Sequence, residues 1–109
     1  ARPFGRLFLE PLAHTVVRVE TGLYLVERYL PSQEVAETSE RVDVATRQTS
    51  SEGTAVRYLG TTYVPGDETC FCEFEAPSRE VVEQVNERAN APYARILPAV
   101  RISTRGKGE

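Results

Sequence analysis

The sequence predicts one α+β domain in which two helices cover one face of a four-stranded antiparallel sheet. Segments with strand and helix character follow one another in the order strand, helix, strand, strand, helix, strand. The chain has 109 residues, which is enough for one modest core. Hydrophobic residues make up 40% of it and charged residues 27%, so a disordered chain is not expected.

The N-terminal part predicts an arm followed by a strand. Residues 1–22 contain Pro3, Pro11 and two glycines and show no sustained hydrophobic period, although residues 16–19 could form a short strand. Residues 23–30 are aliphatic, aromatic and β-branched, and they stop at Pro31. We therefore expect an arm over 1–22 and the first strand over 23–30.

Two helices are predicted from their apolar spacing and their first residues. The first runs from Ser32 to about residue 51 and ends before Gly53, and the second opens at Ser78. Both starts share the pattern Pro-Ser-x-Glu-Val, at 31–35 and at 77–81. Serine is a good N-cap, and we expect both helices to be capped alike, either as generic helix openings or as a duplicated unit.

The remaining strands are predicted at 54–64, 69–75 and 95–103, the last one broken near Pro98, and a polar tail follows at 104–109. The tripeptide at 65–67, Pro-Gly-Asp, predicts a turn that pairs the first two of these strands as a hairpin. Alternation along 69–75 places Cys70, Cys72 and Phe74 on one face. We expect these three in the core, and Phe71, Glu73 and Glu75 on the other face.

This order is the ferredoxin-like βαββαβ arrangement, so residues 23–103 are expected to form a ferredoxin-like domain. Its helices leave one sheet face uncovered, and that face holds large apolar groups such as Phe71 beside carboxylates such as Glu73. A domain of this size rarely exposes such a patch to water. We therefore expect a homodimer packed face to face, with a partly polar cavity between the sheets.

Four segments resemble a small bacterial ferredoxin-like family of uncharacterised proteins that includes a nickel-binding homodimer. They are LVERYLP at 25–31, VRYLGTTYVP at 56–65, DETCFCEFEAP at 67–77 and VNERA at 85–89. The resemblance spans about residues 23–102, and the order and spacing of the segments match. It implies a homodimer that binds divalent nickel, in a role such as sequestration or tolerance.

Candidate metal ligands are few, because the chain has one His and two Cys. Nickel favours imidazole but accepts carboxylate and water. We therefore consider Glu27 and Glu73, which should be neighbours on adjacent strands, together with His14 in the arm. The alternatives are a solvated His14 and carboxylates that are solvated or paired with Arg28. Asp67 and Glu68 are interpreted as ordinary turn residues.

The two cysteines are interpreted as reduced core residues, since Cys70 and Cys72 alone make an incomplete metal shell and are poorly placed to bridge each other.

A second hypothesis for the function is a cofactor-free oxygenase or isomerase in the dimer cavity. It would use Glu27 or Glu73 as the base and tyrosines at 24, 29 and 63 as polar handles. A structural or interaction module is a third possibility. With its single histidine in the arm, the sequence offers no catalytic triad, and its glycines form no phosphate loop.

Charge and hydropathy argue against nucleic-acid and membrane partners. The net charge is −3; the first helix region is acidic, and only the short stretch from Arg95 to the end is basic. No apolar run approaches the roughly 20 residues that span a bilayer, and no secretory leader is evident. We therefore expect a cytoplasmic protein.

Overall fold

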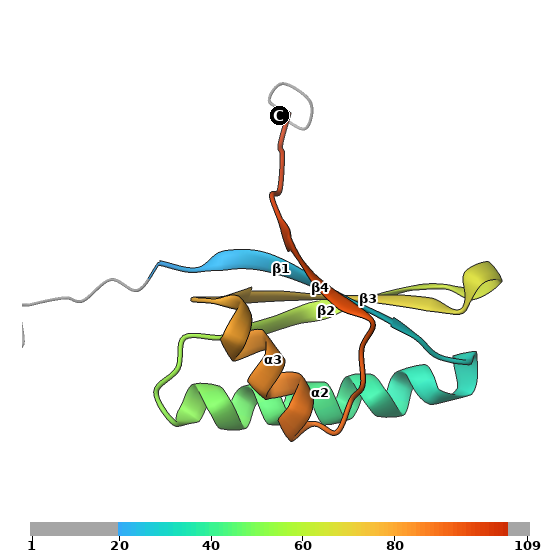
Figure 1. Ribbon diagram of the computed structural model, residues 1–109, viewed down its shortest axis with the longest axis horizontal. Helices are drawn as coiled ribbons and strands as arrows, with labels where there is room; N and C mark the ends of the chain where they lie inside the picture. The colour runs from blue at the N-terminus through green and yellow to red at the C-terminus, as the bar shows by residue number, and fades with distance from the viewer. Residues whose placement is uncertain (1–19, 105–109) are drawn as a thin grey trace, which may run out of the picture.

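A computed structural model describes residues 20–104 of the chain and has the predicted ferredoxin-like order of elements (Figure 1). Two short 3-10 turns, η1 and η2, are added at the start of the first helix and in the hairpin turn. The elements are β1 (Gly22–Tyr29), η1 (Ser32–Glu34), α2 (Val35–Ser51), β2 (Arg57–Val64), η2 (Pro65–Asp67), β3 (Thr69–Ala76), α3 (Arg79–Arg88) and β4 (Arg95–Ala99).

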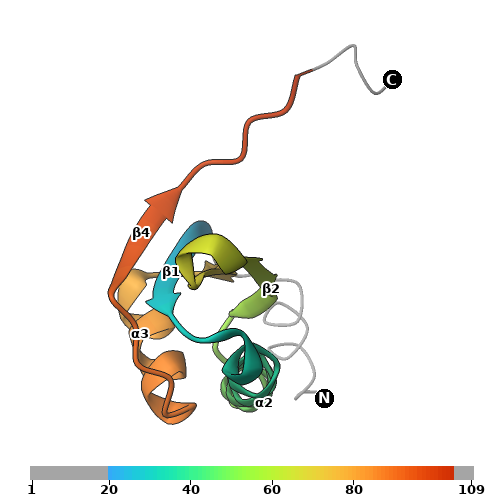
Figure 2. The same cartoon turned by 90° about the vertical axis from the view of Figure 1, so that its right-hand side faces the viewer.

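The four strands form one antiparallel sheet in the order β2-β3-β1-β4. Helices α2 and α3 both lie on the same side of this sheet, as the two views in Figures 1 and 2 show. The other side, which we call the open face, carries no helix. The fold therefore has two layers, and the arrangement predicted from the sequence is confirmed.

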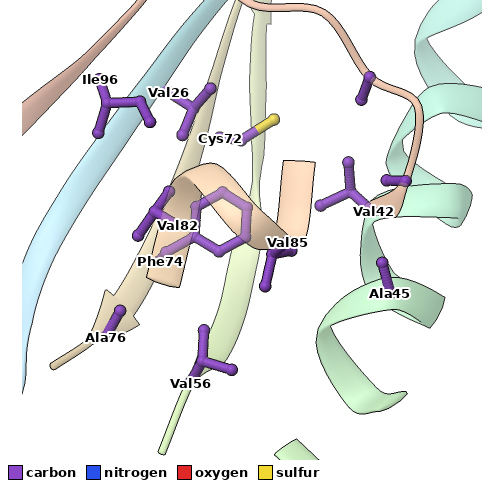
Figure 3. Close-up of a cluster of buried hydrophobic side chains, with 12 residues drawn as sticks. Val26, Val42, Ala45, Val56, Cys72, Phe74, Ala76, Val82, Val85 and Ile96 are labelled. Atoms are coloured by element: carbon purple, nitrogen blue, oxygen red, sulfur yellow. The ribbon is translucent and has the colours of Figure 1, made fainter. Parts of the chain in front are cut away.

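The core lies between the sheet and the helices (Figure 3). Phe74 and Cys72 of β3 and Val26 of β1 meet Val82 and Val85 of α3, and all five are at most 2% exposed. Both cysteines are free and buried, as predicted. The alternation along β3 is also confirmed, since Phe71, Glu73 and Glu75 are only half-buried.

Helix α2 has few aliphatic residues to bury, and threonines complete its buried side. Thr46 and Thr49 donate hydrogen bonds of 2.7 and 2.8 Å to the carbonyl oxygens of Val42 and Ala45, one turn earlier. With the hydroxyl satisfied inside the helix, a threonine can present its methyl group to the core.

The two helix starts differ, which corrects the expectation that they are capped alike. Ser78 has extended backbone and its Oγ accepts a hydrogen bond of 3.4 Å from the Val81 N–H. Ser32 instead begins the 3-10 turn η1, and neither it nor Glu34 makes a side-chain cap at the start of α2. The shared Pro-Ser-x-Glu-Val pattern therefore leads to two different local structures.

Two strands are shorter than predicted. β2 begins at Arg57 rather than at residue 54, and β4 ends at Ala99 rather than at residue 103. Pro98 lies inside β4, an edge strand, where its missing N–H breaks no ladder hydrogen bond that the sheet needs. Residues 100–104 continue beyond the last paired residue.

No helix within residues 20–104 combines the length and the hydropathy needed to cross a bilayer. His14 and the possible strand at 16–19 lie outside the described residues, as does all of the expected tail except Thr104.

Candidate functional site

The open face combines half-buried apolar side chains with charged ones. Alternation along the strands places Leu25 and Glu27 of β1, Phe71 and Glu73 of β3, and Leu97 of β4 on this face. The three apolar side chains, those of Leu25, Phe71 and Leu97, are half-buried although no helix covers them. The face is therefore a mixed surface, as the sequence predicted.

Glu27 is the most enclosed carboxylate of this face, with 6% of the residue exposed. Arg95, its direct partner on β4, donates from Nε to Oε1 at 2.5 Å, and the Tyr29 hydroxyl donates to Oε2 at 2.8 Å. The Arg95 hydrogen bond is the main reason that the pKa of Glu27 is lowered. The same carboxylate raises the pKa of Tyr29. Glu27 is therefore held as an anion with both oxygens engaged.

A surface hollow of about 400 Å³ lies next to Glu27, at the end of the open face. It is lined by Glu27, Tyr29, Val64, Asp67, Thr69 and Phe71. Two carboxylates and two hydroxyl groups thus border one hollow. Such oxygen donors suit a divalent cation.

Asp67 borders this hollow, although its place in the hairpin turn indicates only an ordinary solvent-facing residue. The hairpin turn folds back beside the end of β1: Tyr29 pairs with Thr69, and the Leu30 N–H donates to the Glu68 carbonyl at 2.9 Å. The pairing of the first and third strands was predictable. Extending it by two residues would have placed Asp67 near Tyr29.

The structure does not bring Glu27 and Glu73 together as a pair. The β1–β3 register sets Glu27 opposite Phe71 and Glu73 opposite Leu25, so the two glutamates are diagonal rather than direct neighbours. Both Glu73 oxygens lie 3.4 Å from Nη2 of Arg101. Each carboxylate therefore has its own arginine.

The alternative pairing of Glu27 with Arg28 is wrong, because Arg28 lies on the helix-covered side and is 1% exposed. Its Nη1 donates to the carbonyl oxygens of Ala91 and Pro92 at 2.9 and 3.1 Å, and its Nη2 donates to Asn86 Oδ1 at 2.6 Å. Arg28 thus ties the end of α3 and the following loop to β1. Nothing in the sequence around Arg28 indicates this role.

Of the three tyrosines considered as polar handles, only Tyr29 lies on the open face. Tyr24 packs against the core. Tyr63 donates its hydroxyl to the Leu30 carbonyl at 2.9 Å, and burial raises its pKa. The open face therefore offers one phenol rather than three.

The residues of one chain do not complete a metal site within 20–104, where no three His, Cys, Asp or Glu side chains are grouped to hold an ion. Cys70 and Cys72 are buried in the core, and burial raises the pKa of the Cys70 thiol. The hollow supplies Glu27 and Asp67 at most. Further ligands would have to come from water, from a second copy or from residues outside the described range.

A larger hollow of about 480 Å³ lies on the helix side, between α2 and α3. Two of its arginines are already engaged: Arg88 binds Glu52 at 2.6 Å, and Arg41 donates to the Ala89 carbonyl at 3.0 Å. None of the predicted site residues borders it.

Comparisons with known proteins agree with the fold. A family model described as "Nickel responsive protein SCO4226-like" matches residues 24–98. The crystal structure of SCO4226 from Streptomyces coelicolor A3(2) superposes with a TM-score of 0.57 at 22% identity, covering 75% of this chain and 99% of that one. None of the curated proteins matches the chain.

Proposed function

Because this chain belongs to the SCO4226-like family of nickel responsive proteins, we propose that it binds Ni²⁺ as a homodimer, in a role such as metal sequestration or tolerance. The metal would lie at the open face, in the hollow beside Glu27. The observation that carries this proposal is that Glu27 and Asp67 border the same hollow together with the hydroxyl groups of Tyr29 and Thr69.

The homodimer is supported by the apolar content of the open face. Leu25, Phe71 and Leu97 lie on it without a covering helix, and they would be removed from water if two copies packed through this face. A two-fold interface uses the same patch on both copies. It would also bring each hollow against residues of the other copy.

The metal ligands follow from which contacts of Glu27 can be exchanged. The ion pair with Arg95 holds Oε1, whereas the neutral Tyr29 hydroxyl holds Oε2. We propose that Ni²⁺ takes the place of the tyrosine proton donor at Oε2 and also binds Asp67. Glu73 is held only by 3.4 Å contacts to an exposed arginine, so it is free to turn toward an ion shared across the dimer. His14 would supply an imidazole from the arm.

Titration calorimetry of the purified chain with Ni²⁺, Zn²⁺ and Mg²⁺ tests this function. We expect nickel to bind most tightly, and we expect Glu27→Gln to weaken its binding at least tenfold, or about 1.4 kcal/mol. Glu40→Gln is the matched control, because this exposed glutamate lies on α2, on the other side of the sheet. Absence of heat with millimolar nickel would overturn the proposal.

The alternative of a cofactor-free enzyme is less well supported by the same geometry. A general base works best when its pKa lies near the operating pH. The arginine contact moves the pKa of Glu27 in the opposite direction, and both of its oxygens are occupied.

A further inference from the structure

The hairpin turn between β2 and β3 lies at the same end of the sheet as the last residues of β1 (Figures 1 and 2). The turn contributes Asp67 to the hollow beside Glu27, whereas β1 contributes Glu27 and Tyr29. Asp67 is exposed, so packing alone does not fix its place. The separation of the two carboxylates therefore depends on the hydrogen bonds that hold the turn against β1.

Three hydrogen bonds hold the backbone of the turn. The Tyr63 hydroxyl donates to the Leu30 carbonyl at 2.9 Å, and the Leu30 N–H donates to the Glu68 carbonyl at 2.9 Å. The Thr69 hydroxyl donates to the Asp67 carbonyl at 3.0 Å. Leu30 is the first residue after β1, and both of its backbone polar groups are thus bound to the hairpin.

The turn has a conformation that its own sequence does not favour. Glu68 has φ 49° and ψ 41°, the left-handed region, which is unfavourable for a residue with a Cβ. Such a conformation persists where the surrounding contacts determine the backbone, and it is common at ligand sites. Here the contact from Leu30 is made to the carbonyl of Glu68 itself, directly after Asp67.

We propose that Tyr63 is a positioning residue for the metal site, an inference that rests on the proposed function. Its hydroxyl fixes Leu30, Leu30 fixes the Glu68 carbonyl, and Asp67 is thereby held beside Glu27. Carboxylates that are already in place need not be ordered when the ion binds, which raises the affinity. Tyr63 itself is half-buried, pairs with Cys70 on the helix side and does not line the hollow.

Titration calorimetry of Tyr63→Phe with Ni²⁺ tests this role. The substitution removes one hydroxyl but no charge and no residue of the hollow, and we expect the nickel dissociation constant to rise at least about threefold. Tyr58→Phe is the matched control: it also removes from β2 a hydroxyl that is hydrogen-bonded, to Thr61, but neither residue lines the hollow. Its affinity should equal that of the native chain. Equal affinities of Tyr63→Phe and the native chain would overturn the inference.

The Asp67→Asn background separates positioning from a general loosening of the fold. Asparagine keeps one carbonyl oxygen but loses the charge, so nickel should bind more weakly and still measurably at millimolar concentration. Because Tyr63 acts through Asp67, adding Tyr63→Phe to this variant should change the affinity much less than it does in the native chain. The same fold-change in both backgrounds would overturn the positioning role.

Amide hydrogen exchange tests the clamp without any metal. The Leu30 N–H should exchange at least about tenfold faster in Tyr63→Phe than in the native chain, because its hydrogen bond to the turn opens more often. An unchanged exchange rate would show that Tyr63 does not hold the turn and would overturn the inference. A native chain that takes up no nickel refutes the proposed function and the role of Tyr63 with it. Nickel binding that is equally tight in both chains refutes the role of Tyr63 alone.

Discussion

Arg95 and Glu27 face each other directly across the β1–β4 ladder, and the arginine Nε lies 2.5 Å from the carboxylate Oε1. The contact ties the last strand to the first on the open face, and it determines the charge state of the most enclosed carboxylate there. A cation that binds the other oxygen, Oε2, therefore lies beside a guanidinium group already in place, which opposes its binding by like-charge repulsion. This makes Arg95 a measurable regulator of the proposed nickel affinity.

Replacing Arg95 with Gln should raise the pKa of Glu27, because the interaction that most lowers it is lost. The folded pKa of Glu27 lies below its unfolded value of 4.5, so the pair stabilises the fold above that pH and the stabilisation disappears as the pH falls through the folded pKa. The variant should therefore be less stable than the native chain at pH 7, and this difference should shrink in acid. Urea denaturation at pH 7 and pH 3 measures both quantities.

Arg57→Gln is the matched control, since Arg57 pairs with Glu75 at 3.0 Å across two strands, but 71% of the arginine side chain and 40% of the glutamate side chain are exposed. Its effect on stability should be within about 0.5 kcal/mol. A stability loss for Arg95→Gln that is the same at both pH values would contradict the assigned role of the ion pair.

Replacing Arg28 with Met should destabilise the fold by about 2–4 kcal/mol. The substitution removes the donors that satisfy two loop carbonyls and Asn86 Oδ1 in a buried position, and buried acceptors left without partners are costly. Arg41→Met is the control: Arg41 also donates to loop carbonyls, those of Ala89 and Asn90, but it is exposed and water can replace it. Equal losses in urea denaturation for the two variants would refute the distinction.

Ser78 and Ser32 occupy the same position in the shared Pro-Ser-x-Glu-Val pattern, but only Ser78 caps its helix. Ser78→Ala should cost about 1 kcal/mol, because Ser78 caps α3, whereas Ser32→Ala should cost less than about 0.5 kcal/mol. Thermal or urea denaturation of the two variants compares these values directly. If both substitutions cost the same, the shared pattern rather than the observed cap decides helix stability.

The sequence predicted the element order and the core face of β3 because these depend on local periodicity, which Cys70, Cys72 and Phe74 display clearly. It could not predict which serine caps its helix. That choice depends on backbone angles: Ser78 is extended before α3, while a 3-10 turn separates Ser32 from α2. Local pattern therefore predicted the elements better than their ends.

Only part of the candidate site could be predicted, because local alternation determines which face a residue lies on but not which residue it pairs with. Alternation placed Glu27 and Glu73 on one face, but the register, which depends on the whole hairpin, made them diagonal. Arg95, the arginine partner of Glu27, lies 68 residues away in sequence, and the oxygen acceptors of Arg28 lie about 60 residues away. No local signal reports contacts at that distance. Asp67 was overlooked because turn acids usually contact solvent.

Strand β2 contains a bulge between Tyr58 and Gly60. The ladder pairs Tyr58 with Phe74 and Gly60 with Glu73, so Leu59 is an extra residue and the alternation shifts by one. This shift lets Tyr58 and Thr61, three residues apart, both face the helix side, where their hydroxyl groups are hydrogen-bonded. Gly60 has a φ of +139°, a conformation that other residues rarely adopt, and a Cβ there would meet no atom within 4 Å. Gly60→Ala should therefore cost about 1–3 kcal/mol through backbone strain alone.

Gly66→Ala is the control, because a Cβ at Gly66 also meets open space but its φ is not in the positive range. It should be neutral or slightly stabilising in urea denaturation, since alanine restricts the unfolded chain. A Gly60→Ala variant as stable as Gly66→Ala would show that β2 can lose its bulge without a loss of folding stability. In that case the positions of Tyr58 and Thr61 on one face would not depend on the glycine.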